Sequence, residues 1–144
     1  MDSLKKYTFN DLAMDFAAQA SKKSEDPHRK VGCSIINKEG RLLSIGYNGV
    51  QPKQVLDKNF WSNRDKRRVF VIHAEANALS CITRYQEPFL LASTLLPCSA
   101  CAINIASHGI KTVLYSEEYS LDKKAHDIFS FYKIKLIRYN LDRN

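Results

Sequence analysis

Hydrophobic positions recur along the chain with two different periods, which predict helices and strands. From Thr8 to about Lys22 the apolar residues have helical spacing, and Asp11 has the position of a capping-box partner for Thr8. Val31 to Ile36 is a nearly continuous apolar run, typical of a strand that is buried on both faces. After a turn at Lys38–Gly40, the segment from Arg41 to Tyr47 is predicted to return as a second strand.

In the second half of the chain, strand and helix patterns alternate. The apolar pattern predicts strands at 89–95, 111–116 and 134–139, and helices from His73 to about Arg84, from Pro97 to Gly109, and after a cap at Ser120. This order of elements predicts an α/β protein with a three-layer α/β/α fold around a central five-stranded mixed sheet. The length of 144 residues is that of one domain, which we expect to span 1–144.

The connection at residues 50–70 has the weakest pattern, and we expect a long loop there with at most one helical turn, followed by a strand-like run at 69–72. Six basic residues and two acidic ones fall in this connection (Lys53, Lys58, Arg64, Lys66, Arg67, Arg68; Asp57, Asp65). A charged run of this kind fits either a solvated surface or a functional loop. The sequence leaves both interpretations open.

Charge and composition narrow the classes of partner. The net charge of +7 and the pI near 9.3 favour an anionic partner, either nucleic acid or a phosphorylated small molecule. No apolar run approaches the roughly 20 residues that span a bilayer, and Met1–Lys6 lacks an apolar signal-peptide core. Four cysteines with no disulfide framework favour a reducing compartment. We therefore expect a cytoplasmic protein without a membrane partner.

The residues that point to chemistry follow the strand-like runs before His73 and Pro97. The His73 imidazole and the thiols of Cys98 and Cys101 can close three corners of a zinc tetrahedron, leaving the fourth open for water as in catalytic sites. Glu75 stands two residues after the histidine, where it can contact that water without binding the metal. The pattern H-x-E…P-C-x-x-C is that of the zinc-dependent nucleobase deaminases.

A Cys-x-x-Cys pair alone would also fit a redox pair or half of a structural zinc site. The other two cysteines, Cys33 and Cys81, have no zinc-binding spacing, and we expect them to be small core residues. A structural site that included His73 would leave Glu75 without a role. The combination therefore favours a catalytic metal site.

Over nearly its whole length the chain resembles the deoxycytidylate (dCMP) deaminases, including the small phage enzymes, of the zinc-dependent cytidine deaminase-like superfamily. The resemblance is carried by five short segments: Lys30-Val31-Gly32, Gly46-Tyr47-Asn48-Gly49, His73 to Leu79, Leu96 to Ala102, and Gly109-Ile110. It implies hydrolysis of dCMP to dUMP by a zinc-activated hydroxide, which supplies dUMP for thymidylate synthesis, in host cytoplasm if the chain comes from a phage. It also implies a homo-oligomer, commonly a hexamer, that is regulated by dCTP and dTTP, with Mg²⁺ accompanying a nucleotide effector.

The same resemblance assigns roles to individual residues. Glu75 would be the general acid and base, and His73, Cys98 and Cys101 would hold a single zinc, because residues 49–72 contain no cysteine or histidine for a second one. The resemblance places Asn48 at the deoxyribose and Ala74 in the substrate site. It places Tyr47 and Gly49 in the region of nucleotide effectors. A 5′-phosphate needs cationic or N–H donors at the rim of the pocket, and the candidates are Ser24, Arg29 and Lys30 before the first strand and Tyr119 after the fourth. Two departures concern the effector region: Val50-Gln51 adds a residue before Pro52, and no glycine follows the proline.

Two other functions remain open from the sequence. A tRNA adenosine deaminase, or another nucleic-acid base deaminase, would share the chemistry and use the basic connection to bind its substrate. Gly46-Tyr47-Asn48-Gly49 and the lack of a basic C-terminal helix argue against it. A non-catalytic, zinc-stabilised nucleic-acid-binding module would show salt-dependent RNA binding without ammonia release from dCMP, and Glu75 beside an open ligand position argues against that module.

Overall fold

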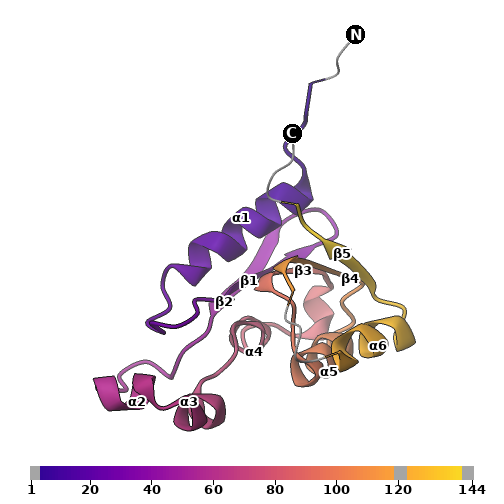
Figure 1. Ribbon diagram of the computed structural model, residues 1–144. Helices are drawn as coiled ribbons and strands as arrows, with labels where there is room; N and C mark the ends of the chain where they lie inside the picture. Colours follow the sequence, from indigo (N-terminus) through magenta and orange to yellow (C-terminus); the bar gives the residue numbers. More distant parts are fainter. Residues whose placement is uncertain (1–3, 119–122, 141–144) are drawn as a thin grey trace.

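Five strands form one mixed sheet at the centre of the protein, in the order β2-β1-β3-β4-β5 (Figure 1). The computed structural model describes residues 4–118 and 123–140. β1 pairs antiparallel with both β2 and β3, whereas β3, β4 and β5 run parallel. The predicted five-stranded mixed sheet is confirmed. The strands are β1 (Gly32–Asn37), β2 (Leu42–Tyr47), β3 (Pro88–Leu95), β4 (Thr112–Glu117) and β5 (Lys135–Arg138).

Helices cover the sheet on both faces, as the order of elements predicted. α1 packs on one face, and α4, α5 and α6 pack on the other, which gives the three layers in Figure 1. The short helices α2 and α3 lie in the connection between β2 and α4. The helical segments are α1 (Phe9–Ser21), α2 (Lys58–Ser62), α3 (Arg64–Phe70), α4 (Ala74–Leu79), the 3₁₀ helix η1 (Arg84–Gln86), α5 (Ser99–Ser107) and α6 (Lys124–Phe131).

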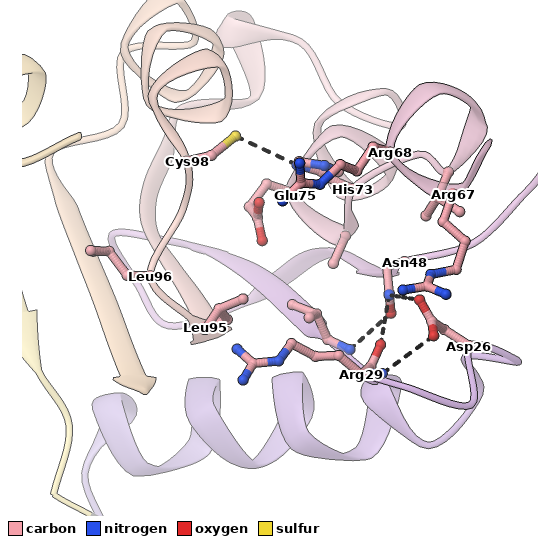
Figure 2. A pocket seen from close by; sticks show the side chains of 13 residues that line it. Asp26, Arg29, Asn48, Arg67, Arg68, His73, Glu75, Leu95, Leu96 and Cys98 are labelled. Carbon is pink, nitrogen blue, oxygen red and sulfur yellow. Dashed lines mark hydrogen bonds between the residues drawn. The ribbon is translucent and has the colours of Figure 1, made fainter. Parts of the chain in front are cut away.

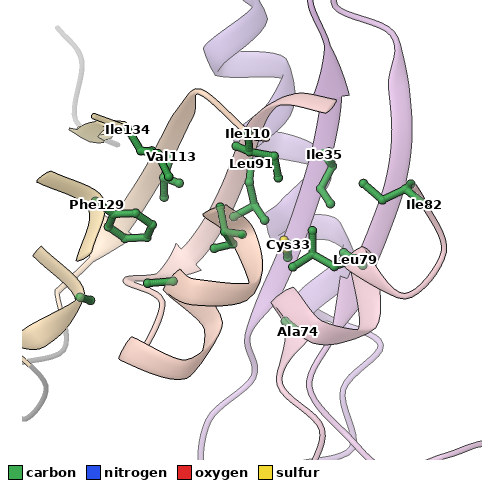
Figure 3. Packing of buried hydrophobic residues seen from close by; sticks show 14 of the residues in the cluster. Cys33, Ile35, Ala74, Leu79, Ile82, Leu91, Ile110, Val113, Phe129 and Ile134 are labelled. Carbon is green, nitrogen blue, oxygen red and sulfur yellow. The ribbon is translucent and has the colours of Figure 1, made fainter. Parts of the chain in front are cut away.

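The central strands are buried on both faces, which explains the unbroken apolar run in β1. Ile35 faces the core under α4, α5 and α6, whereas its neighbour Ile36 faces the core under α1. In the larger core, Leu91 and Val113 of the central strands pack with Phe129 of α6 (Figure 3). The face of the sheet under α4, α5 and α6 therefore supports the helices α4 and α5, which carry the site.

The predicted helix boundaries are confirmed where capping residues fix them. At the start of α1, the Thr8 side chain accepts a hydrogen bond from the Asp11 backbone N–H, and the Asp11 carboxylate accepts one from the Thr8 N–H. Gly109 follows the end of α5 with φ +78°, a conformation that favours glycine. The start of α1 and the end of α5 are thus set by local sequence signals.

The connection between β2 and α4 differs from the prediction of a loop with at most one helical turn. Asp57 and Asn63 accept hydrogen bonds from Phe60 N–H and Lys66 N–H, and these caps begin the two short helices α2 and α3. The strand predicted at 69–72 was also wrong: α3 runs to Phe70, and only Ile72 forms an isolated bridge, with Gly49. Neither helix buries a residue, so hydrophobic periodicity carried no signal for them.

The helix expected to run from His73 to about Arg84 is shorter than predicted, because α4 ends at Leu79. Ser80 Oγ donates to the Asn77 carbonyl, and Thr83 begins η1 with its own capping box, so local side-chain bonds replace further helix. Cys81 in this turn is exposed, which corrects the expectation that it is a core residue, whereas Cys33 is buried. The Ser120 cap that we expected lies outside the described residues.

None of the helices among the described residues is both long enough and apolar enough to cross a membrane.

Candidate active site

The starts of two helices bring the three predicted metal ligands together. His73 is the N-cap of α4, Cys98 is the N-cap of α5, and Cys101 lies in the first turn of α5. The His73 Nδ1 atom is 3.5 Å from the Cys98 Sγ and 3.4 Å from the Cys101 Sγ. Their ligand atoms all lie within 4.8 Å of one another, and within the described parts of the chain this is the one group of metal-binding side chains with such spacing.

The geometry of these three side chains fits zinc. A tetrahedral Zn²⁺ with bonds of about 2.0 Å to nitrogen and about 2.3 Å to sulfur places those two ligand atoms about 3.5 Å apart. The measured distances of 3.5 and 3.4 Å match this edge. A hydrogen bond from the Cys101 thiol lowers the pKa of Cys98 to about 4, and the same bond raises the pKa of Cys101. The pair therefore favours one thiolate, the form that binds zinc.

Glu75 lies in the first turn of α4 with its carboxyl group in the interior, where its exposed fraction is 4%. Ser93 of β3 donates a hydrogen bond from its Oγ to Glu75 Oε1 at 3.0 Å. Burial raises the pKa of Glu75, against smaller lowering effects from hydrogen bonds of Cys101 and Ser93. A raised pKa brings a carboxyl group closer to the range in which it can both take up and release a proton, as a general acid and base must.

His73, Cys98 and Glu75 border a cavity of about 230 Å³ (Figure 2). Its apolar walls come from the residue before β1, the residues at the end of β3, the residue after α3 and the start of α4, and they can pack against the faces of a flat ring. The opposite wall is polar and comes from the loop before β1, from the end of β2, and from α3. The residues that line it besides His73, Glu75 and Cys98 are Asp26, Arg29, Val31, Asn48, Arg67, Arg68, Val71, Ala74, Leu95 and Leu96.

Asn48 holds the loop that precedes β1 against the end of β2. Its Oδ1 accepts from Val31 N–H at 2.8 Å, and its Nδ2 donates to the Arg29 carbonyl at 2.9 Å and to Asp26 Oδ2 at 3.5 Å. Asp26 in turn accepts from the backbone N–H groups of His28 and Arg29. The side chain of Asn48 is 8% exposed and borders the cavity, so it shapes the polar wall directly.

The substrate-site candidates from the sequence do not all meet at this cavity. Arg29, Asn48 and Ala74 line it. Ser24 is buried beside it, where its Oγ donates to the Asn48 carbonyl, and Lys30 Nζ donates to the Ser24 carbonyl. Tyr119 lies outside the described residues. The effector candidates Tyr47 and Gly49 line a separate cavity of about 290 Å³ that also includes Lys23, Glu25, Asn48, Val50, Gln51, Pro52, Lys53, Gln54 and Trp61.

Sequence reasoning did not single out four residues of the site. Arg67 and Arg68 were counted as part of a basic connection, but α3 presents both to the cavity. Asp26 and Ser93 carried no motif, and their roles depend on contacts with residues that are distant in sequence. The one usable signal for Ser93 was the polar pair Ser93-Thr94 within the mostly apolar run that leads to Pro97.

Two helix starts that present an imidazole and two thiols to a metal, with a buried glutamate next to them, are the arrangement of the zinc-dependent nucleobase deaminases. The chain has the fold and site of this class. More narrowly, residues 8–117 match the model of the cytidine and deoxycytidylate deaminase zinc-binding region, and the chain belongs to that family. The predicted family and fold are thereby confirmed.

Individual relatives carry related names. The chain is 34% identical over 130 residues to a Drosophila melanogaster protein named "Probable deoxycytidylate deaminase", and 32% identical over 113 residues to the human deoxycytidylate deaminase. These alignments cover 82% and 74% of this chain, which spans 64% of the length of each of these two relatives. A dCMP deaminase of cyanophage S-TIM5, solved in complex with dCMP and dUMP, superposes with a TM-score of 0.75 at 25% identity, covering 94% of this chain and 100% of that one.

Proposed function

We propose that this protein deaminates dCMP to dUMP by hydrolysis. The observation that carries the proposal is the buried Glu75 carboxylate beside the His73, Cys98 and Cys101 ligand set, in a cavity whose polar wall contains three arginines. The relatives named as deoxycytidylate deaminases, and the dCMP and dUMP bound by the cyanophage enzyme, support the choice of substrate.

Glu75 moves the protons of this reaction. His73, Cys98 and Cys101 would hold zinc, which when bound supplies an activated water as the nucleophile. The Glu75 carboxylate takes a proton from that water and delivers it to N3 of cytosine as the water oxygen bonds to C4. The Glu75 carboxylate then takes the remaining proton from the hydroxyl group on C4 and passes it to the departing amine as the bond between C4 and the exocyclic nitrogen breaks, which releases ammonia and leaves the C4 carbonyl of uracil. A positioned general acid and base of this kind contributes about 10²- to 10⁴-fold.

The arginines of the cavity wall support a 5′-monophosphate rather than a nucleoside. Arg29, Arg67 and Arg68 come from two different segments, and none of them forms an ion pair with a carboxylate within residues 4–118 and 123–140. Asp26, the acidic residue among them, accepts from Asn48 and from two backbone N–H groups. Three guanidinium groups around one cavity repel one another unless an anion lies between them, and guanidinium groups bind phosphate through paired hydrogen bonds.

The remaining substrate roles stay proposals. Both Nδ2 protons of Asn48 already bind protein oxygens, so a contact with the deoxyribose would use the free lone pair of its Oδ1. Ala74 would contribute the apolar wall of the base site. Ser24 and Lys30 would act by holding the polar wall in place, because their polar atoms bind backbone carbonyls.

A side-by-side measurement of kcat/KM for dCMP, deoxycytidine, CMP and tRNA tests the proposal. We expect dCMP to react at least 10-fold better than deoxycytidine, because charge-assisted hydrogen bonds to the phosphate contribute about 1.5–3 kcal/mol each. Equal turnover of dCMP and deoxycytidine would remove the phosphate site from the proposal. Reaction of tRNA alone would identify a nucleic-acid base deaminase that binds its substrate through the basic connection.

The family resemblance also suggests how the activity is regulated, how the chains assemble and where the protein is located, and these points stay predictions. The second cavity, next to Tyr47 and Gly49 and with Lys23 and Lys53 on its rim, is our candidate for a dCTP or dTTP site, with Mg²⁺ on the nucleotide. We expect a cytoplasmic homo-oligomer, a hexamer in the first instance, that supplies dUMP for thymidylate synthesis. Sedimentation with and without dCTP, dTTP and Mg²⁺ would test assembly, and activity at subsaturating dCMP would test regulation.

A further inference from the structure

Ser93 is a polar residue at a position where the fold calls for an apolar one. It lies within β3, and its exposed fraction is 0%. It pairs with Cys33 of β1 and Tyr115 of β4, and its side chain points to the face of the sheet opposite to that of Ala92. The neighbouring odd-numbered residue Leu91 belongs to the apolar core under α4, α5 and α6. A hydroxyl group buried at such a place destabilises the fold unless it forms hydrogen bonds.

Ser93 accepts a hydrogen bond within β3 and donates one to Glu75. The Leu95 backbone N–H is 3.4 Å from Ser93 Oγ and points to it as a weak donor, which leaves the single hydroxyl proton for Glu75 Oε1 at 3.0 Å. Cys33, across the strand, is a poor alternative donor to the carboxylate, because its Sγ is directed to the Ser34 carbonyl at 3.9 Å. Ser93 is therefore the hydroxyl donor that the sheet offers to this carboxyl group.

We propose that Ser93 is a positioning residue for Glu75: its hydroxyl fixes one carboxylate oxygen to the central strand, so that the other oxygen is held in the direction of the reacting base. A glutamate has three side-chain torsions that the backbone of α4 does not fix, and the hydrogen bond from Cys101 holds the carboxyl group from the side of α5 only. A fixed Oε1 removes most of that freedom before substrate binds. Since a displacement of about 1 Å at a reacting group can cost about 100-fold in rate, the gain belongs to kcat.

Three substitutions separate positioning from a merely structural hydrogen bond. Ser93→Ala removes the bond to Glu75, and Ser93→Thr retains a hydroxyl at the same place. Ser34→Ala is the matched control: Ser34 lies on the adjacent strand β1, is also 0% exposed, and donates its Oγ proton to the Ala13 carbonyl at 2.6 Å. Ser93→Ala and Ser34→Ala each remove one fully buried hydroxyl hydrogen bond, and only Ser93→Ala touches Glu75.

We expect Ser93→Ala to lower kcat for dCMP by roughly 10- to 100-fold with KM changed less than about twofold, while zinc content stays at the wild-type value. Ser34→Ala should leave kcat within about twofold of wild type, and Ser93→Thr should recover most of the lost rate. If Ser93→Ala keeps kcat within twofold, or if Ser34→Ala lowers kcat as much, the positioning role is wrong. Should Ser93→Thr fail to fold, the Ser93→Ala and Ser34→Ala pair still decides.

The kinetic arm depends on the proposed function, so a second readout is needed that does not. Crystal structures of zinc-loaded wild type and Ser93→Ala should show one Glu75 side-chain conformer in the wild type and several, or a different one, in the variant. A wild-type protein that releases no ammonia from any cytosine nucleotide would overturn the proposed function and leave this comparison intact. An unchanged Glu75 conformer in Ser93→Ala would overturn the positioning role even in an active enzyme.

Discussion

The two sides of the candidate active site are anchored to the protein in different ways. The chemical side consists of the starts of α4 and α5, where Ala74, Glu75 and Ala78 of α4 and Cys101 of α5 are buried against the sheet. The recognition side includes the segment of residues 50–72, which we call the α2–α3 segment and in which neither helix buries a residue. The chemical side is packed against the hydrophobic core, and the α2–α3 segment is held by a few polar contacts.

The close approach of α4 to the sheet depends on a glycine. A Cβ atom on Gly46 of β2 would lie 2.4 Å from the Ala74 carbonyl oxygen and 2.6 Å from the Ala78 backbone nitrogen, so any side chain there would displace the helix. Because α4 lies directly on β2, His73 and Glu75 at its start have little freedom to move. Core packing thus sets the position of the α4 backbone from which the Glu75 side chain extends.

The α2–α3 segment is held mainly at its base and at one carbonyl group. Gly49 and Ile72 form an isolated antiparallel bridge with N–O distances of 3.0 and 2.7 Å, which brings the two ends of the segment together. Within the segment, the Trp61 carbonyl accepts a hydrogen bond from Arg67 Nη1 and lies 3.0 Å from His28 Nε2. Segments with few buried contacts open at low free-energy cost. Changes on the chemical side should therefore affect kcat, and changes in the α2–α3 segment should affect substrate binding.

The largest effect is expected from removing a metal ligand. His73→Ala should abolish the proposed deamination and lower the zinc content from one per chain to near zero, because a tetrahedral site with two protein ligands binds zinc far more weakly. His108→Ala is the control, since the imidazole of His108 bonds to the Asn104 carbonyl and has no thiol partner. Metal analysis and activity should be measured on the same preparations. Two tightly held zincs per wild-type chain would contradict the one-zinc assignment.

Replacement of Glu75, the proposed general acid and base, should have the next largest effect. Glu75→Gln retains the shape of the side chain but cannot take up the proton, so kcat should fall by about 10²- to 10⁴-fold. Zinc content and the melting temperature should stay close to the wild-type values, because Glu75 does not bind the metal. A variant that retains more than about a hundredth of wild-type kcat would show that another group carries the proton.

The contrast between the two sides also explains what the sequence could predict. The ligands and Glu75 were predictable because they fall in short motifs next to strands and helix starts that the local sequence shows. Thr8 begins α1 and Gly109 follows the end of α5 for equally local reasons. Arg67 and Arg68 were not assigned to the site, because α2 and α3 bury nothing and therefore leave no apolar period to read. Ser93 was missed for another reason: its partner, Glu75, is 18 residues away, and only the fold brings the two together.

A smaller effect, confined to substrate binding, is expected from replacing an arginine of the polar cavity wall. Arg68→Ala should lower kcat/KM for dCMP by about 10- to 100-fold, which corresponds to the loss of one charge-assisted contact of about 1.5–3 kcal/mol. Its effect on deoxycytidine should be less than about twofold, because that substrate has no phosphate to lose. Arg64→Ala is the matched control on the same helix, since Arg64 is exposed and does not line the cavity. Equal losses with both substrates would move Arg68 from phosphate binding to a structural role.

The smallest effects are expected from removing two helix caps of the same kind. This pair of variants tests whether the α2–α3 segment is anchored to the protein more weakly than the core helices are. The Thr8 side chain accepts from Asp11 N–H at 3.1 Å at the start of α1, and the Asn63 side chain accepts from Lys66 N–H at 3.1 Å at the start of α3. Each cap contributes about 1 kcal/mol to its helix. α1 packs into the core, so the loss of its cap is a loss for the whole fold, whereas α3 can fray without exposing buried surface.

Thr8→Ala should therefore lower the melting temperature by about 3–5 °C and leave KM for dCMP unchanged. Asn63→Ala should change the melting temperature by less than about 1 °C, because α3 can lose its first turn while the core stays folded. The same variant should raise amide hydrogen exchange across the α2–α3 segment and increase KM for dCMP a few fold, since the frayed α3 presents Arg67 and Arg68 less often. If Asn63→Ala lowers the melting temperature as much as Thr8→Ala does, the α2–α3 segment unfolds together with the core, and the difference in anchoring does not hold.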